Sequence, residues 1–295
     1  MKKTRAGFVA VVGRPNAGKS TLLNHLVGEK LAMVSQKAQA TRKRMNIIVM
    51  HGSTQIIFVD TPGIHDKEKL LNQFMLEEAL KAMGDSDMIL FLAPAVDTVD
   101  TYVRFLKQIE GKNTPHMVAL TQTDRVSQAL LLQRLSEYQP YQEYFEAIIP
   151  FSIKRGGDKA HLLDIIVAAL PEHPWLYDPE LLTTDTIREI YRELIREAIF
   201  DNLSDEIPYE SDVVIDRVDE REEIDRVYAT IVVEKPTQKG MMVGRGGSTI
   251  RRLGRDARHL METLVGKRIY LDLHVAVKKG WSKNRKGLEE MGYIS

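Results

Sequence analysis

The chain contains no cysteine among its 295 residues, which excludes a disulfide framework and any metal site built on thiolates. Long hydrophobic runs are absent too: the longest, MILFLAPAV at 88–96, is far shorter than the ~20 residues of a membrane-spanning helix. The opening MKKTRAGFVAVVG has a basic start and a short apolar stretch, but it continues into GRPNAGKS instead of a cleavage site. We therefore expect a cytoplasmic globular protein whose first apolar stretch is a buried strand.

The whole chain also lacks an excess of either charge, with 41 basic and 41 acidic residues. This balance hides a division, because residues 235–295 hold 14 Lys and Arg against 5 Asp and Glu, whereas residues 178–234 hold 6 against 18. A basic C-terminal fifth is typical of a surface that meets a polyanion. Two ordinary solvated surfaces would give the same counts, so charge alone leaves both interpretations open.

Short apolar runs alternate with amphipathic stretches through the first 170 residues. This alternation predicts a mostly parallel sheet with helices on both faces, the architecture of an α/β domain. Ligands of such sheets bind at the carboxyl ends of the strands. The expected strands are 7–12, 46–51, 55–60, 88–93, 116–121 and 147–152.

The second half follows a different order, and a proline-rich stretch, LPEHPWLYDPE at 170–180, separates the two. An amphipathic helix at 186–203 precedes two alternating strands at 211–219 and 225–235, a glycine turn inside helical patterning at 239–266, and a strand at 268–279. The predicted order is α-β-β-α-α-β, an α+β domain. We expect a first domain at 1–173, a linker at 174–185 and a second domain at 186–295.

The segment GRPNAGKS matches the phosphate-loop pattern G-x-x-x-x-G-K-[ST], and it follows a predicted strand and opens a predicted helix, as the motif requires. Backbone N–H groups of such a loop wrap the phosphates. Lys19 is expected to reach the β and γ oxygens and Ser20 to ligate Mg²⁺. The predicted nucleotide-binding residues here are Gly13, Arg14, Pro15, Asn16, Ala17, Gly18, Lys19, Ser20 and Thr21.

The segment DTPGI narrows the class of nucleotide-binding protein. Asp60 ends a predicted strand, where it can hold magnesium directly or through water. Gly63 can offer its N–H to the γ-phosphate because no side chain blocks the approach. Thr41 lies between the two motifs and is a candidate second hydroxyl ligand to magnesium, although a polar loop residue is an equally good interpretation. The predicted contacts of this segment are Asp60, Thr61, Pro62, Gly63 and Ile64.

The segment GRGG, residues 244–247, is a GXXG loop of the kind that clamps backbone nucleotides in KH domains. A glycine turn with Ser248 capping the next helix is the plainer alternative. The arginines that follow the loop and the strand order around it favour RNA. The predicted RNA contacts are Gly244, Arg245, Gly246, Gly247, Arg251, Arg252, Arg255, Lys278 and Lys279. Trp281 could stack on RNA from the basic tail, or simply pack the tail onto the domain.

Together, GRPNAGKST, QATR, DTPGIH and the α-β-β-α-α-β tail resemble the Era-type bacterial GTPases, which end in a type II KH domain. The resemblance covers nearly the whole chain. It implies a monomeric switch that uses GTP, GDP and Mg²⁺, binds the 3′ end of small-subunit ribosomal RNA and assists assembly of the small ribosomal subunit. It also implies peripheral contact with the inner face of the membrane, which nothing in the residues supports independently.

Family members carry Asn-Lys-x-Asp where this chain has Thr121, Gln122, Thr123 and Asp124. The two carboxylate oxygens of Asp124 match the paired N–H donors of guanine, and adenine would leave them unpaired. A helix cap is the alternative role for Asp124. Thr121 can make only part of the usual tie to the phosphate loop, and Gln122 stacks less on the base than lysine. We therefore expect guanine preference with affinity lower by ~1–2 kcal/mol. Ser152 and Ile153 stand where the family has Ser-Ala beside the base.

The expected catalytic residues are Lys19, Thr41, Gly63 and Asn16. Ile64 replaces the glutamine that orients water in many GTPases, so we expect slow intrinsic turnover. Asn16 matches relatives in which K⁺ stabilises the developing charge, which is a hypothesis here. Two other functions remain open: an RNA-binding assembly factor with a weak nucleotide site and little turnover, and an ATPase, which Asp124 argues against.

Overall fold

The computed structural model describes residues 3–34, 41–63, 70–111, 114–154, 159–204 and 206–294. The chain divides into two compact units. Among the described residues, the first contains 3–28, 41–63 and most of 75–184, and the second contains residues from 185 onward together with 29–34 and 70–74. No helix within these described ranges is long and apolar enough to span a membrane.

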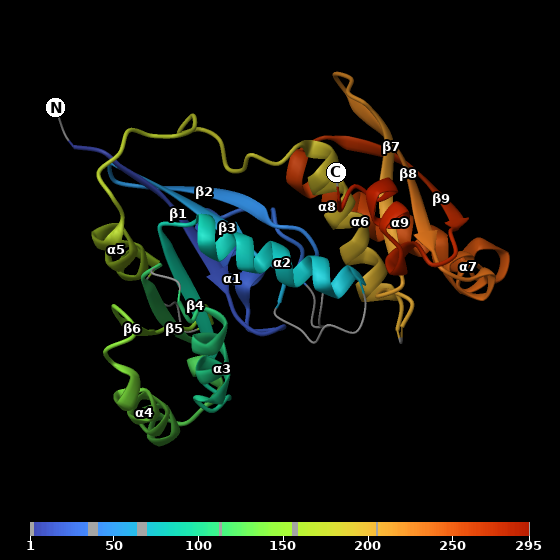
Figure 1. The fold of residues 1–295 in the computed structure, drawn as a ribbon. Helices are drawn as coiled ribbons and strands as arrows, with labels where there is room; N and C mark the ends of the chain where they lie inside the picture. The colour runs from blue at the N-terminus through green and yellow to red at the C-terminus, as the bar shows by residue number, and fades with distance from the viewer. Residues whose placement is uncertain are drawn as a thin grey trace. The chain divides into compact units, whose positions relative to one another are not determined.

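The first unit is built on a six-stranded sheet in the order β2-β3-β1-β4-β5-β6 (Figure 1). Every neighbouring pair is parallel except β2 with β3, whose short connection allows only an antiparallel hairpin. The predicted α/β architecture is confirmed. The strands are β1 (Arg5–Val12), β2 (Met45–His51), β3 (Thr54–Asp60), β4 (Met88–Pro94), β5 (His116–Thr121) and β6 (Ile148–Pro150).

Helices cover both faces of this sheet (Figure 1). One face carries a core in which Phe91 packs on Tyr102 and Phe105, with partly buried leucines of α2 and α4 around it. On β1 the side chains of Val9 and Val11 are also fully buried, so the strands are apolar on both sides, as parallel strands between two helix layers require. The helices are α1 (Lys19–Val27), α2 (Leu70–Asp85), α3 (Asp100–Gln108), α4 (Gln128–Glu137) and α5 (Lys159–Ala169).

The strand register brings the expected nucleotide-binding residues to one edge of the sheet. Val11 of β1 pairs with Asp60 of β3, so the phosphate loop begins beside the aspartate predicted to hold magnesium. Pro94 of β4 pairs with Thr121 of β5, which places the predicted base-reading segment, residues 121–124, level with the end of β4. This edge holds the carboxyl ends of the parallel strands, where ligands of such sheets bind.

The predicted linker packs on the first unit through hydrogen bonds. Gln55 of β3 is fully buried, and its side-chain oxygen accepts from the N–H groups of Leu176 (2.8 Å) and Tyr177 (3.0 Å). Further along, Thr183 donates its hydroxyl to the carbonyl of Asn46 at 2.6 Å. The linker thereby covers part of β2, the edge strand of the sheet, whose unpaired backbone would otherwise be exposed.

The second unit has the predicted α-β-β-α-α-β order around a three-stranded sheet, β7-β8-β9 (Figure 1). Strand β7 is antiparallel to β8, and β8 is parallel to β9, the mixed sheet of a type II KH domain. Thr186 begins the first helix with a complete capping box to Glu189. The elements are α6 (Ile187–Asn202), β7 (Ser211–Asp219), β8 (Ile224–Val233), α7 (Pro236–Val243), α8 (Ser248–Val265), β9 (Arg268–Val277) and α9 (Arg285–Glu290).

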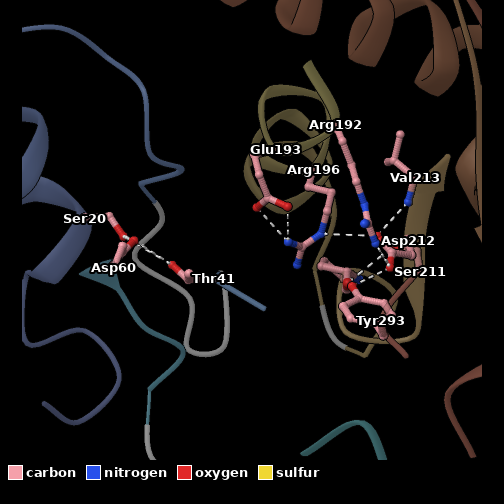
Figure 2. A network of polar contacts seen from close by, with 11 residues as sticks. Ser20, Thr41, Asp60, Arg192, Glu193, Arg196, Ser211, Asp212, Val213 and Tyr293 are labelled. Carbon is pink, nitrogen blue, oxygen red and sulfur yellow. Dashed lines mark hydrogen bonds and ion pairs between the residues drawn. The ribbon is translucent and has the colours of Figure 1, made fainter. Parts of the chain in front are cut away.

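A buried polar cluster joins α6, β7 and the C-terminal segment of this unit (Figure 2). The carboxylate of Asp212 accepts from Arg192 at 2.6 Å and from the hydroxyl of Tyr293, and Arg196 Nε lies 3.6 Å from its other oxygen. Arg196 also donates to Glu193 at 2.8 and 3.0 Å. The neighbouring anions keep both guanidinium groups charged, so the pKa of Arg196 is raised although burial opposes its charge.

Candidate functional site

The phosphate loop, residues 13–18, wraps the end of its own lysine. Lys19 is buried at the start of α1, and its ammonium donates to the carbonyls of Gly13 at 3.0 Å and Arg14 at 3.2 Å. Burial lowers the pKa of Lys19 to about 8, against the opposing attraction of Asp60. A phosphate chain entering this loop would supply the negative charge that favours the protonated form. Gly18 adopts φ 96° at the helix start, a left-handed conformation that suits glycine.

The three predicted magnesium ligands converge on one point (Figure 2). Ser20 Oγ donates to Asp60 Oδ2 at 2.8 Å, Thr41 Oγ1 lies 3.2 Å from Ser20 Oγ, and Thr41 Oγ1 lies 3.5 Å from Asp60 Oδ2. Two hydroxyls and one carboxylate are hard oxygen donors, the ligand set that Mg²⁺ takes beside nucleotide phosphates. No cluster of three or more His, Cys, Asp or Glu in the described ranges offers a different metal site.

Gly63 lies close against the phosphate loop, where a side chain would crowd Pro15. A Cβ at this position would lie 3.0 Å from the backbone nitrogen and from Cγ of Pro15. Thr61, two residues earlier, is fully buried and donates its hydroxyl to the carbonyl of Val11 at 2.7 Å, so its side chain fixes the segment to β1. Pro62 is buried as well. Ile64 falls outside the described residues, so its expected position beside the γ-phosphate stays a prediction.

The base-reading segment forms a short turn after β5. Ser152 donates its hydroxyl to Asp124 Oδ1 at 2.7 Å, and this hydrogen bond lowers the pKa of Asp124. The alternative role of Asp124 as a helix cap is wrong: α4 is capped by Ser127, whose Oγ accepts from the N–H of Leu130 at 3.2 Å. Asp124 is therefore ionised and oriented by a neighbour from a different loop, as a reader of paired N–H donors must be.

Two residues of this segment contact the phosphate loop. Thr121 donates its hydroxyl to the carbonyl of Ala17 at 3.1 Å, and Gln122 donates its side-chain amide to the carbonyl of Asn16 at 3.2 Å. Thr121 and Thr123 are buried, and Ile153 is half-buried beside Ser152. In the same phosphate loop, Arg14 donates to Asp97 Oδ1 at 2.8 Å. The sequence did not indicate a role for Asp97 beside the phosphate loop, because Asp97 lies 83 residues from Arg14 and belongs to no recognised motif.

The GXXG loop of the KH domain connects α7 to α8. Gly244, Gly246 and Gly247 have φ values of 74°, 58° and 78°, which side chains rarely adopt. A Cβ on Gly244 would lie 2.3 Å from Thr249 Oγ1. The residue before α8 is Gly247, with no side-chain cap, so the Ser248 cap considered as an alternative is wrong. The loop places the exposed Arg245 at a helix N-terminus, where anions bind, while the N–H groups of Gly244 and Gly247 donate to the carbonyls of Gly240 and Gly244.

The basic residues around the GXXG loop differ in their exposure and in their hydrogen-bond and ion-pair partners. Arg251 and Arg255 are exposed on α8, where Arg255 pairs with Asp256 at 3.0 Å, and Arg252 donates to the carbonyl of Asn202 at 3.2 Å. Lys279 is exposed after β9, and Lys278 is paired with Glu290.

Trp281 packs in the interior of the second unit. Its side chain is fully buried, its ring stacks on that of Tyr293 with centroids 6.3 Å apart, and its Nε1 donates to the carbonyl of Glu210 at 3.2 Å. Glu234 accepts from the backbone of Gly280 and from both the backbone and hydroxyl of Ser282. The interpretation of the tail as a packed structural element is therefore correct, and stacking of Trp281 on RNA is excluded in this conformation.

A phosphate loop, a cluster of two hydroxyls and a carboxylate beside it, and an oriented aspartate after β5, followed by a GXXG domain, are the features expected of a P-loop GTPase joined to a KH domain. Residues 8–122 match the family described as 50S ribosome-binding GTPase, and residues 194–282 match the KH domain family. Relatives include the GTPase Era of Campylobacter concisus, 48% identical over 98% of this chain and 100% of the relative, and that of Helicobacter pylori strain 26695, 48% identical over 99% and 98%. The chain belongs to the Era family of GTPases.

Solved structures agree with this assignment over the full length. A variant of Aquifex aeolicus Era bound to GDP·AlF4⁻ superposes with a TM-score of 0.94 at 28% identity, covering 99% of this chain and 100% of that one. A structure of Era in complex with MgGDPNP and nucleotides 1506–1542 of 16S ribosomal RNA gives the same TM-score, identity and coverage. This chain is accordingly a GTPase with a C-terminal KH domain.

Proposed function

We propose that this protein is a GTP-driven switch that binds the 3′ end of small-subunit ribosomal RNA and assists assembly of the small ribosomal subunit. The observation that carries the proposal is the GXXG loop, because its left-handed glycines bring the backbone and the exposed Arg245 to the N-terminus of α8, a position that favours phosphates. The similar Era structure holds nucleotides 1506–1542 of 16S ribosomal RNA, which identifies the chemical class of the partner.

We favour the small ribosomal subunit over the large one as the partner, because the similarity that points to the small subunit covers more of the chain. The family described as 50S ribosome-binding GTPase matches only residues 8–122, which exclude the KH domain. The relative in complex with 16S ribosomal RNA is similar over 99% of this chain and therefore includes the domain that would meet RNA. We assign the RNA contacts to the GXXG residues 244–247, to Arg251, Arg252 and Arg255, and to Lys278 and Lys279.

In the nucleotide site we assign the phosphates to residues 13–21, the magnesium to Ser20, Thr41 and Asp60, and guanine to Asp124 with Ser152. Ser20, Thr41 and Asp60 would hold Mg²⁺, which would supply positive charge beside the phosphates during transfer. Lys19 and the Gly63 N–H would stabilise the γ-phosphate from the protein side. Asn16 is exposed at the tip of the loop, where a K⁺ ion could reach both the side chain and the phosphates; equal turnover in sodium and potassium would rule this out.

The domain assignments are also proposals: a GTP-binding domain at 1–173, a linker at 174–185 and a KH domain at 186–295 in a monomeric protein. A ribosomal partner places the activity in the cytoplasm. The family resemblance adds peripheral contact with the inner face of the membrane, which co-sedimentation of the purified chain with anionic vesicles would test.

The decisive experiment measures phosphate release from GTP and from ATP, with and without small-subunit ribosomal RNA. The proposal expects turnover of GTP alone and a change in rate when RNA is added. GTP binding with negligible turnover in both conditions would instead favour the assembly factor with a weak nucleotide site, and turnover of ATP would contradict guanine recognition by Asp124.

A paired substitution tests the RNA-binding surface separately. Arg245→Asp with Gly246→Asp places two carboxylates where RNA phosphates would lie and should abolish RNA binding while GTP turnover without RNA is unchanged. Arg188→Asp, at an exposed position of α6, is the matched control for a change of charge in the same domain and should leave RNA binding close to that of the native protein.

A further inference from the structure

Side chains from two neighbouring loops hold the phosphate loop through hydrogen bonds. Three loop residues in a stretch of four, Arg14, Asn16 and Ala17, are each hydrogen-bonded from outside the loop. The partners come from the turn after β4 and from the segment after β5, which the register of the parallel strands places side by side.

Asp97 fixes the first of these residues. Its carboxylate accepts from Arg14 Nη2 at 2.8 Å and from Arg14 Nε, while Arg14 Nη1 donates to the carbonyl of Pro15 at 2.8 Å. A guanidinium held along both edges has little freedom to turn toward a phosphate. The side chain of Arg14 therefore stabilises the conformation of the phosphate loop. The carbonyl of the same residue is one of the two that accept a hydrogen bond from Lys19.

Gln122 fixes the second residue. Asn16 and Gln122 are the non-glycine residues with left-handed backbone in the described ranges, with φ values of 60° and 56°. Such a conformation costs of order 1 kcal/mol or more and persists only where surrounding contacts enforce it. The amide of Gln122 donates to the carbonyl of Asn16, so each of the two strained turns is tied to the other. Thr121 adds the tie to Ala17.

We propose that Asp97 is a positioning residue that preorganises the phosphate loop for GTP and GDP, in addition to the tie that Thr121 and Gln122 retain from the family's segment after β5. A loop already in its bound shape does not have to be ordered by the ligand, and that saving appears as affinity. Gln122 acts on the phosphate loop, a role different from stacking on the base. These hydrogen bonds to Arg14, Asn16 and Ala17, called the brace below, offset part of the affinity loss expected from the departures at Thr121 and Gln122. This inference rests on the nucleotide site proposed above.

The test measures dissociation constants of GDP, GTP, ATP and guanosine for the full chain carrying Asp97→Ala or Gln122→Ala. Loss of a charged hydrogen bond corresponds to about a tenfold or larger change in affinity, and loss of a neutral one to about a threefold to tenfold change. We expect Asp97→Ala to bind GDP and GTP about tenfold more weakly and Gln122→Ala about threefold to tenfold more weakly, with the preference for GTP over ATP retained in both. Guanosine, which has no phosphates, should bind Asp97→Ala as it binds the native protein. Gln122→Lys keeps a donor and should bind GDP at least as well as native.

Asp100→Ala is the matched control, because Asp100 lies three residues after Asp97 and its carboxylate accepts from Thr98 instead. It should bind nucleotides as the native protein does. Should Asp97→Ala fail to fold, Asp97→Asn keeps an acceptor for Arg14 and should give an intermediate loss. Native affinity for GDP in Asp97→Ala would overturn the part of Asp97 in the brace, as would an equal loss of guanosine binding. Failure of the native chain to prefer GTP over ATP would instead overturn the proposed nucleotide site.

Discussion

Replacing Asp212 should remove the charge on which the polar cluster of the KH domain depends (Figure 2). Its side chain is fully buried and accepts from Arg192 at 2.6 Å and from Tyr293, with Arg196 Nε 3.6 Å away. In Asp212→Ala two buried guanidinium groups would remain with Glu193 as their nearby anion. Breaking a buried ion pair from one side costs about 3–5 kcal/mol. That is a large share of the ~5–15 kcal/mol that stabilises a typical domain.

Urea unfolding of the full chain provides the measurement, with Trp281 as the probe. The chain has two tryptophans, and a Trp175→Phe background leaves the buried Trp281 as the single reporter of the KH domain. Tyr293→Phe, which removes one hydrogen bond to the carboxylate, should cost about 1–2 kcal/mol. Asp216→Ala on the same strand is the control, because Asp216 is exposed and its loss should cost less than about 1 kcal/mol.

The order of the three costs is the test. A loss below about 1 kcal/mol in Asp212→Ala would refute the reasoning, because it would mean that the guanidinium groups find other partners or water without cost. A Tyr293→Phe cost equal to that of Asp212→Ala would show that anchoring of the C-terminal segment, and not the buried charge, is what stabilises the domain.

Three further predictions concern the GTPase domain. Asp124→Asn should lower GTP affinity about 100-fold or more and raise XTP affinity, because an amide cannot accept from both guanine donors; unchanged selectivity in competition binding would contradict this. Burial lowers the pKa of His116 from 6.5 to about 4, so the folded protein takes up fewer protons than the unfolded chain. Stability should therefore fall by up to ~3 kcal/mol as pH drops from 6.5 to 4, and urea melts of His116→Gln should lack that part of the pH dependence. Gln55→Ala removes three hydrogen bonds to the linker and should cost about 3 kcal/mol, seen as faster proteolysis near residue 176; native protease resistance would show that these bonds do not anchor the linker.

Local patterns in the sequence predicted the backbone of both domains. The alternation of apolar and amphipathic stretches specified the parallel sheet, because burial on both faces leaves few polar positions in the strands. Predicted strands 116–121 and 211–219 have the observed boundaries. The strand expected at 147–152 is shorter, Ile148–Pro150, although the N–H of Phe151 still donates to the carbonyl of Leu120 at 2.9 Å.

The sequence by itself also determined which chemistry each loop offers. Glycines at Gly18, Gly244 and Gly247 permit left-handed turns, and the adjoining Lys19 and Ser20 supply the groups that a phosphate and a magnesium ion need. Such motifs can be read directly because a turn and the next few residues form a local unit, whose conformation depends mainly on its own side chains.

Only the tertiary structure decided which side chains meet. Ser152 reaches Asp124 over 28 residues, and Asp97 reaches Arg14 over 83. The sequence was compatible with Trp281 either stacking on RNA or packing in the core, and only its burial in the folded domain decided between the two. Contacts of this kind depend on strand order, on register and on the packing of the segments that follow the strands. A one-residue change in register would move every side chain to the opposite face, so partners distant in sequence are fixed only when the whole domain is folded.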